Sequence, residues 1–325
     1  MRAPHLILGI GELLWDVLPD GMRLGGAPAN FAVMAGRLGN HAVILSRIGR
    51  DELGRQAIDR LNPMPVETGY LQVDPERQTG RVTVALAAGE PHYTIHAPAA
   101  WDFFELTGEW IQLAERADAI CFGSLSQRNQ HSRDVIHSLA AACKADCVRI
   151  FDVNLRPPYY STEILQESLE LATVVKMNHS EVPLVLEMLD LLAEDDAGSF
   201  SPQKPAGKPH PASTILRMAS DRLLGEFPSL ELVAITRGGH GSFLATRDLW
   251  NEHPGFPVRV VDGIGAGDAF TAALAHYLLR GADLATLNEA GNRWGGWIAS
   301  QSGAMPALPD PVRNAIAAAI EGAAT

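Results

Sequence analysis

Short apolar runs alternate along this chain with longer segments of helical periodicity, and this alternation constrains the fold more than any other feature. A strand followed by a helix is the unit from which parallel sheets are built. We therefore expect one α/β domain over residues 1–325, with a mainly parallel central sheet flanked by helices. The predicted strands are His5–Ile10, Ala42–Ile48, Ala119–Phe122, Val148–Asp152, Val174–Met177, Leu232–Thr236 and Val258–Val261. The predicted helices are Asn30–Leu38, Leu53–Leu61, His131–Ala142, Ser213–Leu224, Ala269–Arg280 and Leu284–Ser300.

Two segments interrupt the alternation. Two β-like runs within residues 80–95 flank Gly89-Glu90, and this pattern predicts a hairpin. We expect a small β lid over residues 80–102, outside the main sheet. Residues 194–211 are rich in proline, glycine and charge, a composition typical of an exposed, flexible insertion.

Charge and composition exclude several classes of protein. The formal net charge is −12, so the chain lacks the basic surface of a nucleic-acid-binding protein. No apolar run has the length of a membrane span or the form of a secretion signal, so we expect no membrane partner and a cytoplasmic location. The cysteines follow no paired metal-ligand spacing, and their low, odd count of three fits a reducing compartment.

The segment Asp262–Asp268, with the sequence DGIGAGD, carries the strongest chemical signal. A predicted strand leads into a glycine-rich turn and then into a helix, whose first amides can bind an anion. Asp268 lies at the helix start, where an ionised carboxylate is favoured. Phosphoryl transfer to an alcohol requires such a base beside an anion site. The alternative is a structural turn in which Asp268 only caps the helix.

A second signal lies near the N-terminus, in Asp16, Gly25-Gly26 and Asn30. A carboxylate, exposed glycine amides and a carboxamide together offer the donors and acceptors that neighbouring hydroxyl groups need. We expect Asp16 just after a strand and Asn30 at the opening of a helix. An ordinary turn with Asn30 near the helix N-cap is the alternative.

Two common nucleotide-binding motifs are excluded. The chain has no G-x-x-x-x-G-K-[ST] sequence, so it is not a Walker-type NTPase. Gly9-Ile10-Gly11 begins like a dinucleotide fingerprint, but Leu14 stands where the third glycine belongs. This departure argues against a Rossmann dehydrogenase.

The glycine-rich segments resemble the two signatures of the ribokinase-like (PfkB) carbohydrate kinases. The first resemblance lies in Gly25–Asn30 with Ala35–Gly39, and the second in Asp262–Asp268. Four further segments follow in the family's order, namely Gly49–Gly54, Phe151–Pro157, Asn178–Glu181 and Thr236–Gly241. The resemblance spans roughly residues 5–310. It implies a ribokinase-like fold and ATP-dependent phosphorylation of a sugar hydroxyl.

The resemblance also implies roles for individual residues. Asp268 would be the catalytic base, beside an anion hole formed by Gly265, Ala266 and Gly267. The residues expected to hold the sugar are Asp16, Gly25, Gly26, Asn30 and Arg156. The residues expected to border ATP are Asn178, Thr236, Gly238, Gly241 and Asn292. Glu181 would organise hydrated Mg²⁺, while Asp262 and Gly303 would bind a monovalent cation such as K⁺. One departure concerns this last site, because Gly263 replaces a threonine that many members have.

The N-terminal segment Leu14–Pro19 resembles the fructokinase-like branch of the family and indicates fructose or a related ketose. A 2-keto-3-deoxy sugar acid, a nucleoside and a non-catalytic sensing role are the alternatives. Arg156 could contact an acidic sugar or a phosphate, or pair with a structural carboxylate. Tyr93 and Trp101 could cover the sugar with an aromatic face, or merely pack the lid. A homodimer formed through the lid would fit this organisation.

Overall fold

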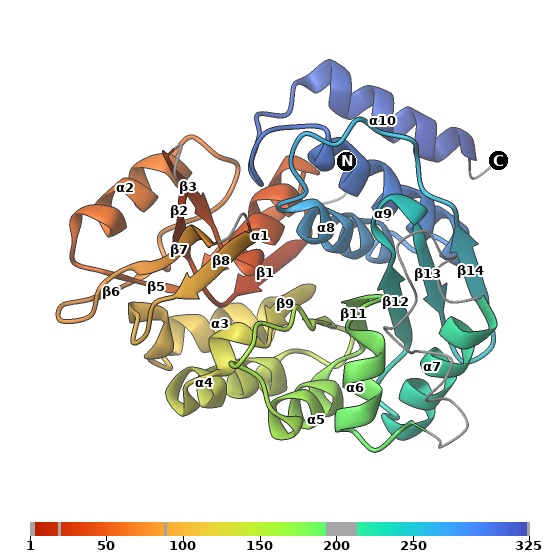
Figure 1. Ribbon diagram of the computed structural model, residues 1–325, viewed down its shortest axis with the longest axis horizontal. Helices are drawn as coiled ribbons and strands as arrows, with labels where there is room; N and C mark the ends of the chain where they lie inside the picture. Colours follow the sequence, from red (N-terminus) through yellow and green to blue (C-terminus); the bar gives the residue numbers. More distant parts are fainter. Residues whose placement is uncertain (1–3, 19–20, 88–89, 193–212, 324–325) are drawn as a thin grey trace.

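The computed structural model describes residues 4–18, 21–87, 90–192 and 213–323. Its centre is an eight-stranded sheet (Figure 1). The strands, in spatial order, are β14 (Trp250–His253), β13 (Ser242–Ala245), β12 (Leu232–Thr236), β11 (Val174–Asn178), β10 (Val148–Asp152), β9 (Ala119–Gly123), β1 (Leu6–Ile10) and β4 (His41–Leu45). All neighbours from β12 to β4 pair in parallel, and only the pairs β12–β13 and β13–β14 are antiparallel. The predicted, mainly parallel α/β sheet is confirmed.

Helices cover both faces of this sheet (Figure 1). One face carries α1 (Ala27–Arg37), α8 (Ala266–Leu278), α9 (Leu284–Ala299) and α10 (Asp310–Ala323). The other carries α3 (Gly108–Arg116), α4 (Gln130–Ala142), α5 (Thr162–Leu171), α6 (Val182–Met188) and α7 (Ser213–Glu226). Successive residues of β1 alternate between the two cores, with Ile7 in one and Leu8 in the other. Burial on both faces explains why the strands appear in the sequence as continuous apolar runs.

A second, smaller sheet stands beside the main one, and we call it the small sheet (Figure 1). Its order is β3 (Gly21–Gly25), β2 (Leu14–Leu18), β7 (Gly80–Ala87) and β8 (Glu90–Ile95). The strands β7 and β8 form the predicted hairpin, and β2 extends it in parallel to β7. A two-stranded sheet of β5 (Arg47–Gly49) and β6 (Gln72–Asp74), together with α2 (Glu52–Leu61), completes this part of the chain.

Several predicted elements differ from the structure. The helix predicted over Ala269–Arg280 is Ala266–Leu278, so that Ala266 and Gly267 lie in its first turn. The strand predicted over Val258–Val261 is wrong, because this segment pairs with no strand in the described part of the chain and Val260 is 63% exposed. The strand predicted over 42–48 is two strands, since the chain leaves the main sheet at Ser46. The first helix begins at Ala27 instead of Asn30, because Pro28 fits a first turn, where its missing N–H is not needed.

Two expectations concern partners and mobility. Among the residues described, no helix combines the length and the apolar character needed to cross a bilayer. The flexible insertion predicted over 194–211 lies outside the described residues.

Candidate active site

Polar side chains gather where the parallel strands of the main sheet end. Glu12 follows β1, Asp152 ends β10, Asn178 ends β11 and Thr236 ends β12. Asn178 and Thr236 lie opposite each other in the ladder between β11 and β12. The carboxyl edge of an open parallel sheet is where α/β proteins place their ligands. The candidate site therefore lies at this edge.

Asp268 and Asn30 meet at this edge. The Asn30 Nδ2 donates a hydrogen bond of 2.7 Å to Asp268 Oδ2 across 238 positions of sequence. Asn30 lies near the start of α1 and Asp268 near the start of α8. These two helices pack against each other. The two glycine-rich signals of the sequence thus form one site. Asn30 is therefore not merely a residue near a helix N-cap.

The environment of Asp268 raises the pKa of its carboxyl. Burial raises the pKa of its carboxyl to about 6, and the nearby Asp152 carboxylate acts in the same direction. The Lys176 ammonium, the Asn30 hydrogen bond and the Arg156 guanidinium oppose this rise. At neutral pH the group is therefore ionised, yet it is more basic than an ordinary aspartate. A carboxylate in this state is suited to act as a general base.

The glycine turn before α8 has free backbone donors. Gly265 is the N-cap residue with φ of 79°, a left-handed conformation that favours glycine, and a Cβ there would lie 2.6 Å from the Ala304 Cβ. Within the described chain, neither Gly265 N–H nor Gly267 N–H has an acceptor. The Ala266 N–H makes only a long contact of 3.4 Å with Gly263 O. The predicted anion-binding residues therefore point unpaired or weakly paired donors beside Asp268.

Asp16 comes to the site from the small sheet. It lies inside β2 and not after a strand as expected, because the short run Leu14–Leu18 pairs with both β3 and β7. A Cβ on Gly25 would lie 3.0 Å from Asp16 Oδ2, so this glycine leaves the carboxylate open on that side. Burial raises the pKa of Asp16, and the Arg156 and Arg23 guanidinium groups counteract the rise.

Gly26 connects Asp16 and Asn30. Its φ of 112° and its position, where a Cβ would lie 2.2 Å from Glu12 O, both require glycine. The Gly26 carbonyl accepts the Asn30 N–H at 2.9 Å. The predicted sugar-binding residues Asp16, Gly25, Gly26 and Asn30 are thus brought together.

Arg156 lies exposed beside these carboxylates. Its positive charge lowers the pKa of Glu12, Asp16 and Asp268. In the described part of the chain its guanidinium bonds only to the Leu155 carbonyl, at 3.0 Å, and pairs with no carboxylate. The structure therefore does not show the alternative, in which Arg156 pairs with a structural carboxylate.

Glu12 belongs to the site although no role was predicted for it. It is 3% exposed, and Oε1 accepts the Ala27 N–H at 3.2 Å at the start of α1. Burial raises its pKa to about 7, and the Asp268 carboxylate acts in the same direction. The only signal in the sequence was an acidic residue directly after an apolar strand, which has many structural explanations.

Asn178 and Glu181 form a closed turn at the end of β11. The Asn178 Oδ1 accepts the N–H groups of Ser180 and Glu181 at 2.9 and 3.1 Å. The Glu181 carboxylate accepts the Leu155 and Asn178 N–H groups, both at 2.8 Å. Each Glu181 oxygen keeps a second lone pair that can accept from a metal-bound water. The residue therefore fits the predicted outer-sphere contact with Mg²⁺.

Gly238 and Gly241 border the end of β12, where backbone segments meet closely. Gly238 has φ of 59°, and a Cβ on Gly241 would lie 1.9 Å from His253 O. A larger residue at 241 would therefore push apart the strands β13 and β14.

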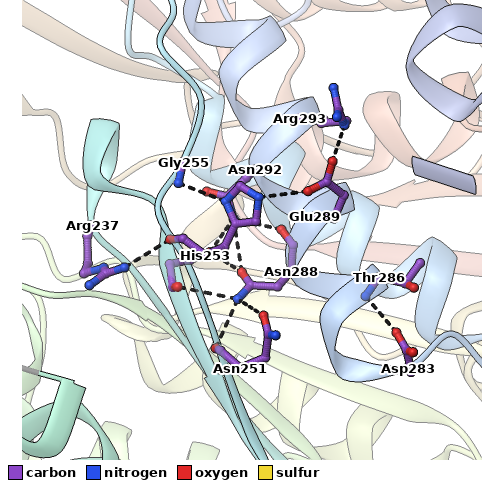
Figure 2. A network of polar contacts seen from close by, with 11 residues as sticks. Arg237, Asn251, His253, Gly255, Asp283, Thr286, Asn288, Glu289, Asn292 and Arg293 are labelled. Atoms are coloured by element: carbon purple, nitrogen blue, oxygen red, sulfur yellow. Dashed lines mark hydrogen bonds and ion pairs between the residues drawn. The ribbon is translucent and has the colours of Figure 1, made fainter. Parts of the chain in front are cut away.

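Asn292 belongs to a network that ties α9 to β13 and β14 (Figure 2). Its Nδ2 donates to Ser242 Oγ at 2.6 Å and to Asn288 O at 2.8 Å. Asn288 in turn donates to Asn251 Oδ1 at 2.8 Å, and His253 bonds to Glu289 at 2.8 Å. The network holds the chain after β14 against α9. Asn292 therefore has a structural task besides the predicted place beside a nucleotide.

The predicted cation residues Asp262 and Gly303 also meet. The Asp262 carboxylate accepts N–H groups of Ile264 and Gly303 at 3.0 and 3.1 Å, and Arg23 Nη1 at 3.3 Å. An arginine already supplies positive charge at this carboxylate. In the described residues no three Asp, Glu, His or Cys side chains group as a metal site. A monovalent cation at this place would share the Asp262 carboxylate with Arg23.

Trp101 lies in the core and not over the candidate site. Its side chain is fully buried in the core, with the Arg128 guanidinium 4.0 Å from the ring centroid. A Cβ on Gly80 would lie 2.3 Å from Trp101 Nε1, so this glycine makes room for the indole. The alternative of packing is correct. The side chain of Tyr93 lies outside the described residues.

Comparison with known proteins places this site in a family. Residues 19–311 match the family described as pfkB family carbohydrate kinase. Fructokinase-2 of Oryza sativa subsp. japonica is 27% identical over 328 residues, covering 94% of this chain and 91% of the relative. An uncharacterized sugar kinase from Pyrococcus horikoshii superimposes with a TM-score of 0.77 at 25% identity, covering 98% and 100% of the two chains. A fructokinase from Vibrio cholerae O395, solved with fructose, ADP and calcium, has a TM-score of 0.75 at 25% identity, with coverages of 96% and 98%.

These likenesses extend over nearly the whole chain and confirm the expected ribokinase-like fold. They also agree with the motifs from which the resemblance was first inferred. The chain therefore belongs to the pfkB family of carbohydrate kinases.

Proposed function

We propose that this carbohydrate kinase transfers the γ-phosphoryl group of ATP to a hydroxymethyl hydroxyl of a ketose, with fructose the first candidate. One observation carries the proposal. The Asp268 carboxylate, oriented by Asn30, stands beside the free N–H groups of Gly265 and Gly267. A base and an anion-binding turn in contact are what phosphoryl transfer to an alcohol requires.

The reaction then follows from this geometry. Asp16, Gly26 and Asn30 hold the sugar hydroxyls and direct one toward Asp268. Asp268 takes the hydroxyl proton while the oxygen attacks the γ-phosphorus and the bond to ADP breaks. The N–H groups of Gly265 and Gly267 donate to the phosphoryl oxygens, where negative charge is shared in the transition state. Glu181 would hold Mg²⁺ through water, and this ion would neutralise phosphate charge.

The nucleotide would lie on the other side of α8. Val258, Val260, Val261 and Ile264 are exposed, although they are large and apolar. They precede the anion-binding turn, and a Cβ on Gly296 of α9 would lie 3.4 Å from Val258 Cγ1. An apolar surface of this kind suits the face of an adenine. We assign the borders of the nucleotide to this surface and to Asn178, Thr236, Gly238, Gly241 and Asn292.

Fructose is favoured by the named relatives. Several of them are fructokinases, and the fructokinase of Vibrio cholerae was solved with fructose and ADP. A 2-keto-3-deoxy sugar acid is the second candidate, because the unpaired Arg156 guanidinium beside the pocket could bind a carboxylate. The cytoplasmic location, the lid, K⁺ and the homodimer stay predictions.

An ADP-release assay tests the proposal. Purified protein is incubated with ATP and Mg²⁺ and with fructose, other ketoses, a 2-keto-3-deoxy sugar acid or nucleosides. We expect ADP release that needs both the sugar and the metal, and that Asp268→Asn abolishes. A preference for the acid that Arg156→Met removes would favour the second candidate. Nucleoside preference, or no ADP release with any compound, would contradict the proposal.

A further inference from the structure

A buried lysine lies beside the anion-binding turn. Lys176, in β11, is 7% exposed, and its Nζ lies 3.0 and 3.1 Å from the two oxygens of Asp152. Thr271 of α8 donates to the same carboxylate at 2.9 Å. An ammonium group has three N–H donors. Within the described chain, Asp152 is the only hydrogen-bond acceptor of the Lys176 ammonium, so at least one of its N–H groups has no acceptor there.

The lysine ammonium lies against the turn itself. A Cβ built on Gly267 would lie 2.9 Å from Lys176 Nζ and 3.8 Å from its Cε. The Gly267 backbone is not left-handed, so its φ does not require glycine. Lys176 instead explains why residue 267 is a glycine, because the lysine ammonium fills the space that a side chain at this position would need. Lys176 is therefore in contact with the turn whose N–H groups have no acceptor.

The charges around Lys176 exceed what a structural pair needs. Asp152, Asp268 and Glu181 all raise the pKa of the ammonium, while burial lowers it, and the net direction is upward. Lys176 is thus charged at neutral pH. One carboxylate would suffice to neutralise a structural lysine, yet this cation lies among three, at the point where phosphate charge must be accommodated.

We propose that Lys176 is a catalytic residue whose ammonium binds the transferred phosphoryl group together with the N–H groups of Gly265 and Gly267. The inference rests on the proposed function and deepens it. Lys176 keeps its proton throughout, because the hydroxyl proton goes to Asp268. Its contact with the phosphoryl oxygens strengthens as the bond to ADP breaks and the bond to the sugar oxygen forms.

Lys176→Met tests this role through binding and turnover. We expect kcat to fall by about 10² to 10³, the usual effect of removing one such donor. Affinity for a non-hydrolysable ATP analogue with Mg²⁺ should fall about tenfold, while ADP affinity should change little, because ADP lacks the contacted group. Equal losses for the two nucleotides, or unchanged kcat, would overturn the assignment.

A double variant separates catalysis from packing. Lys176→Met alone leaves Asp152 buried without a cation and could unfold the chain. Lys176→Met with Asp152→Asn removes both charges, and the asparagine oxygen can still accept from Thr271. We expect this variant to fold, to bind ADP and to stay slow. Recovery of kcat would show that Lys176 only holds Asp152, and would overturn the proposal.

The chain also offers a matched control. Lys144 pairs with Asp118 at 2.6 Å, away from the candidate site. Lys144→Met should leave the ratio of ATP-analogue to ADP affinity unchanged. If the unmodified protein releases no ADP with any sugar, the proposed function fails. If it phosphorylates a sugar and Lys176→Met does so equally well, only the role of Lys176 fails.

Discussion

The carboxamide of Asn30 donates a 2.7 Å hydrogen bond to the carboxylate of Asp268, which joins the starts of α1 and α8. Asn30 is 5% exposed, and its Oδ1 has no partner among the described residues. One end of the carboxamide therefore holds the Asp268 carboxylate, and the other is a buried acceptor whose hydrogen-bonding capacity is unused. A sugar hydroxyl bound by Asn30 would lie next to the group that must remove its proton.

Asp268→Asn should separate catalysis from stability. The amide is nearly isosteric, so substrates should still bind, while kcat should fall by roughly 10² to 10⁴. The pKa of the Asp268 carboxyl is about 6 in the folded chain, above its ordinary value of 3.8, which applies to the unfolded chain. The folded state thus binds the proton of Asp268 more tightly than the unfolded state does. The free energy of unfolding therefore falls as pH rises from about 3.8 to about 6.

The same substitution should therefore increase the free energy of unfolding at pH 7, by about 1 kcal/mol after allowance for residual solvent contact. Steady-state kinetics and a denaturant titration of one preparation measure both effects. Normal turnover in the folded variant would contradict the base assignment, and lower stability would contradict the burial argument.

The pH profile should report the ionisation of Asp268 and its coupling to a neighbouring carboxylate. We expect kcat/KM to fall as pH drops through about 6, because Asp268 must be ionised. Asp152→Asn removes a neighbouring negative charge that raises the pKa of Asp268, so this pKa should decrease and the acid limb should move to lower pH. An exposed control, Glu109→Gln at the start of α3, should not move the limb. An unshifted limb in Asp152→Asn would show that the Asp152 and Asp268 carboxyl groups are uncoupled.

Gly267→Ala should lower turnover by displacing Lys176. The new Cβ would lie 2.9 Å from an ammonium that Asp152 holds in place. We expect at least roughly a tenfold loss of kcat, as for other misplaced catalytic groups. In a Lys176→Met background the same substitution should cost little more, because its target is gone. Additive losses in the double variant would mean that Gly267 acts independently of the lysine.

Gly263→Thr should fold normally. A Cβ at this position meets no atom within 4 Å, and the backbone is not left-handed. ATP binding should persist, and the stiffer loop should change the dependence of activity on monovalent cations. Activity titrated with K⁺ and with Na⁺ in both proteins measures the effect. Identical curves would show that residue 263 does not control cation dependence.

The small sheet should become more protected when sugar binds. Asp16 lies in β2, which pairs with β7, so a sugar held by Asp16 would stabilise this sheet. Hydrogen exchange over β7 and β8 should slow at saturating sugar, while exchange in the buried strand β10 should not change. Unchanged exchange in the small sheet would argue against a lid.

Local patterns in the amino-acid sequence determine much of this protein's architecture. Alternating apolar runs and helical segments correctly predicted the parallel sheet, with β10 and β12 at their observed bounds. The glycine turn before Asp268 was also predicted, because a left-handed residue such as Gly265 is a local requirement of the chain. Such features depend on neighbours a few positions away, and the sequence displays those neighbours directly.

Tertiary packing alone decided the rest. An apolar run such as Val258–Val261 has the composition of a strand, but whether a partner strand is free depends on distant segments. Trp101 is equally apolar in a core or over a sugar, and only the space left by Gly80 places it in the core. Lys176 meets Gly267, and Asn30 meets Asp268, because the strand ends and the starts of α1 and α8 converge at one edge of the sheet. Residues so far apart in sequence share no local pattern, so their chemistry becomes visible only when the fold brings them together.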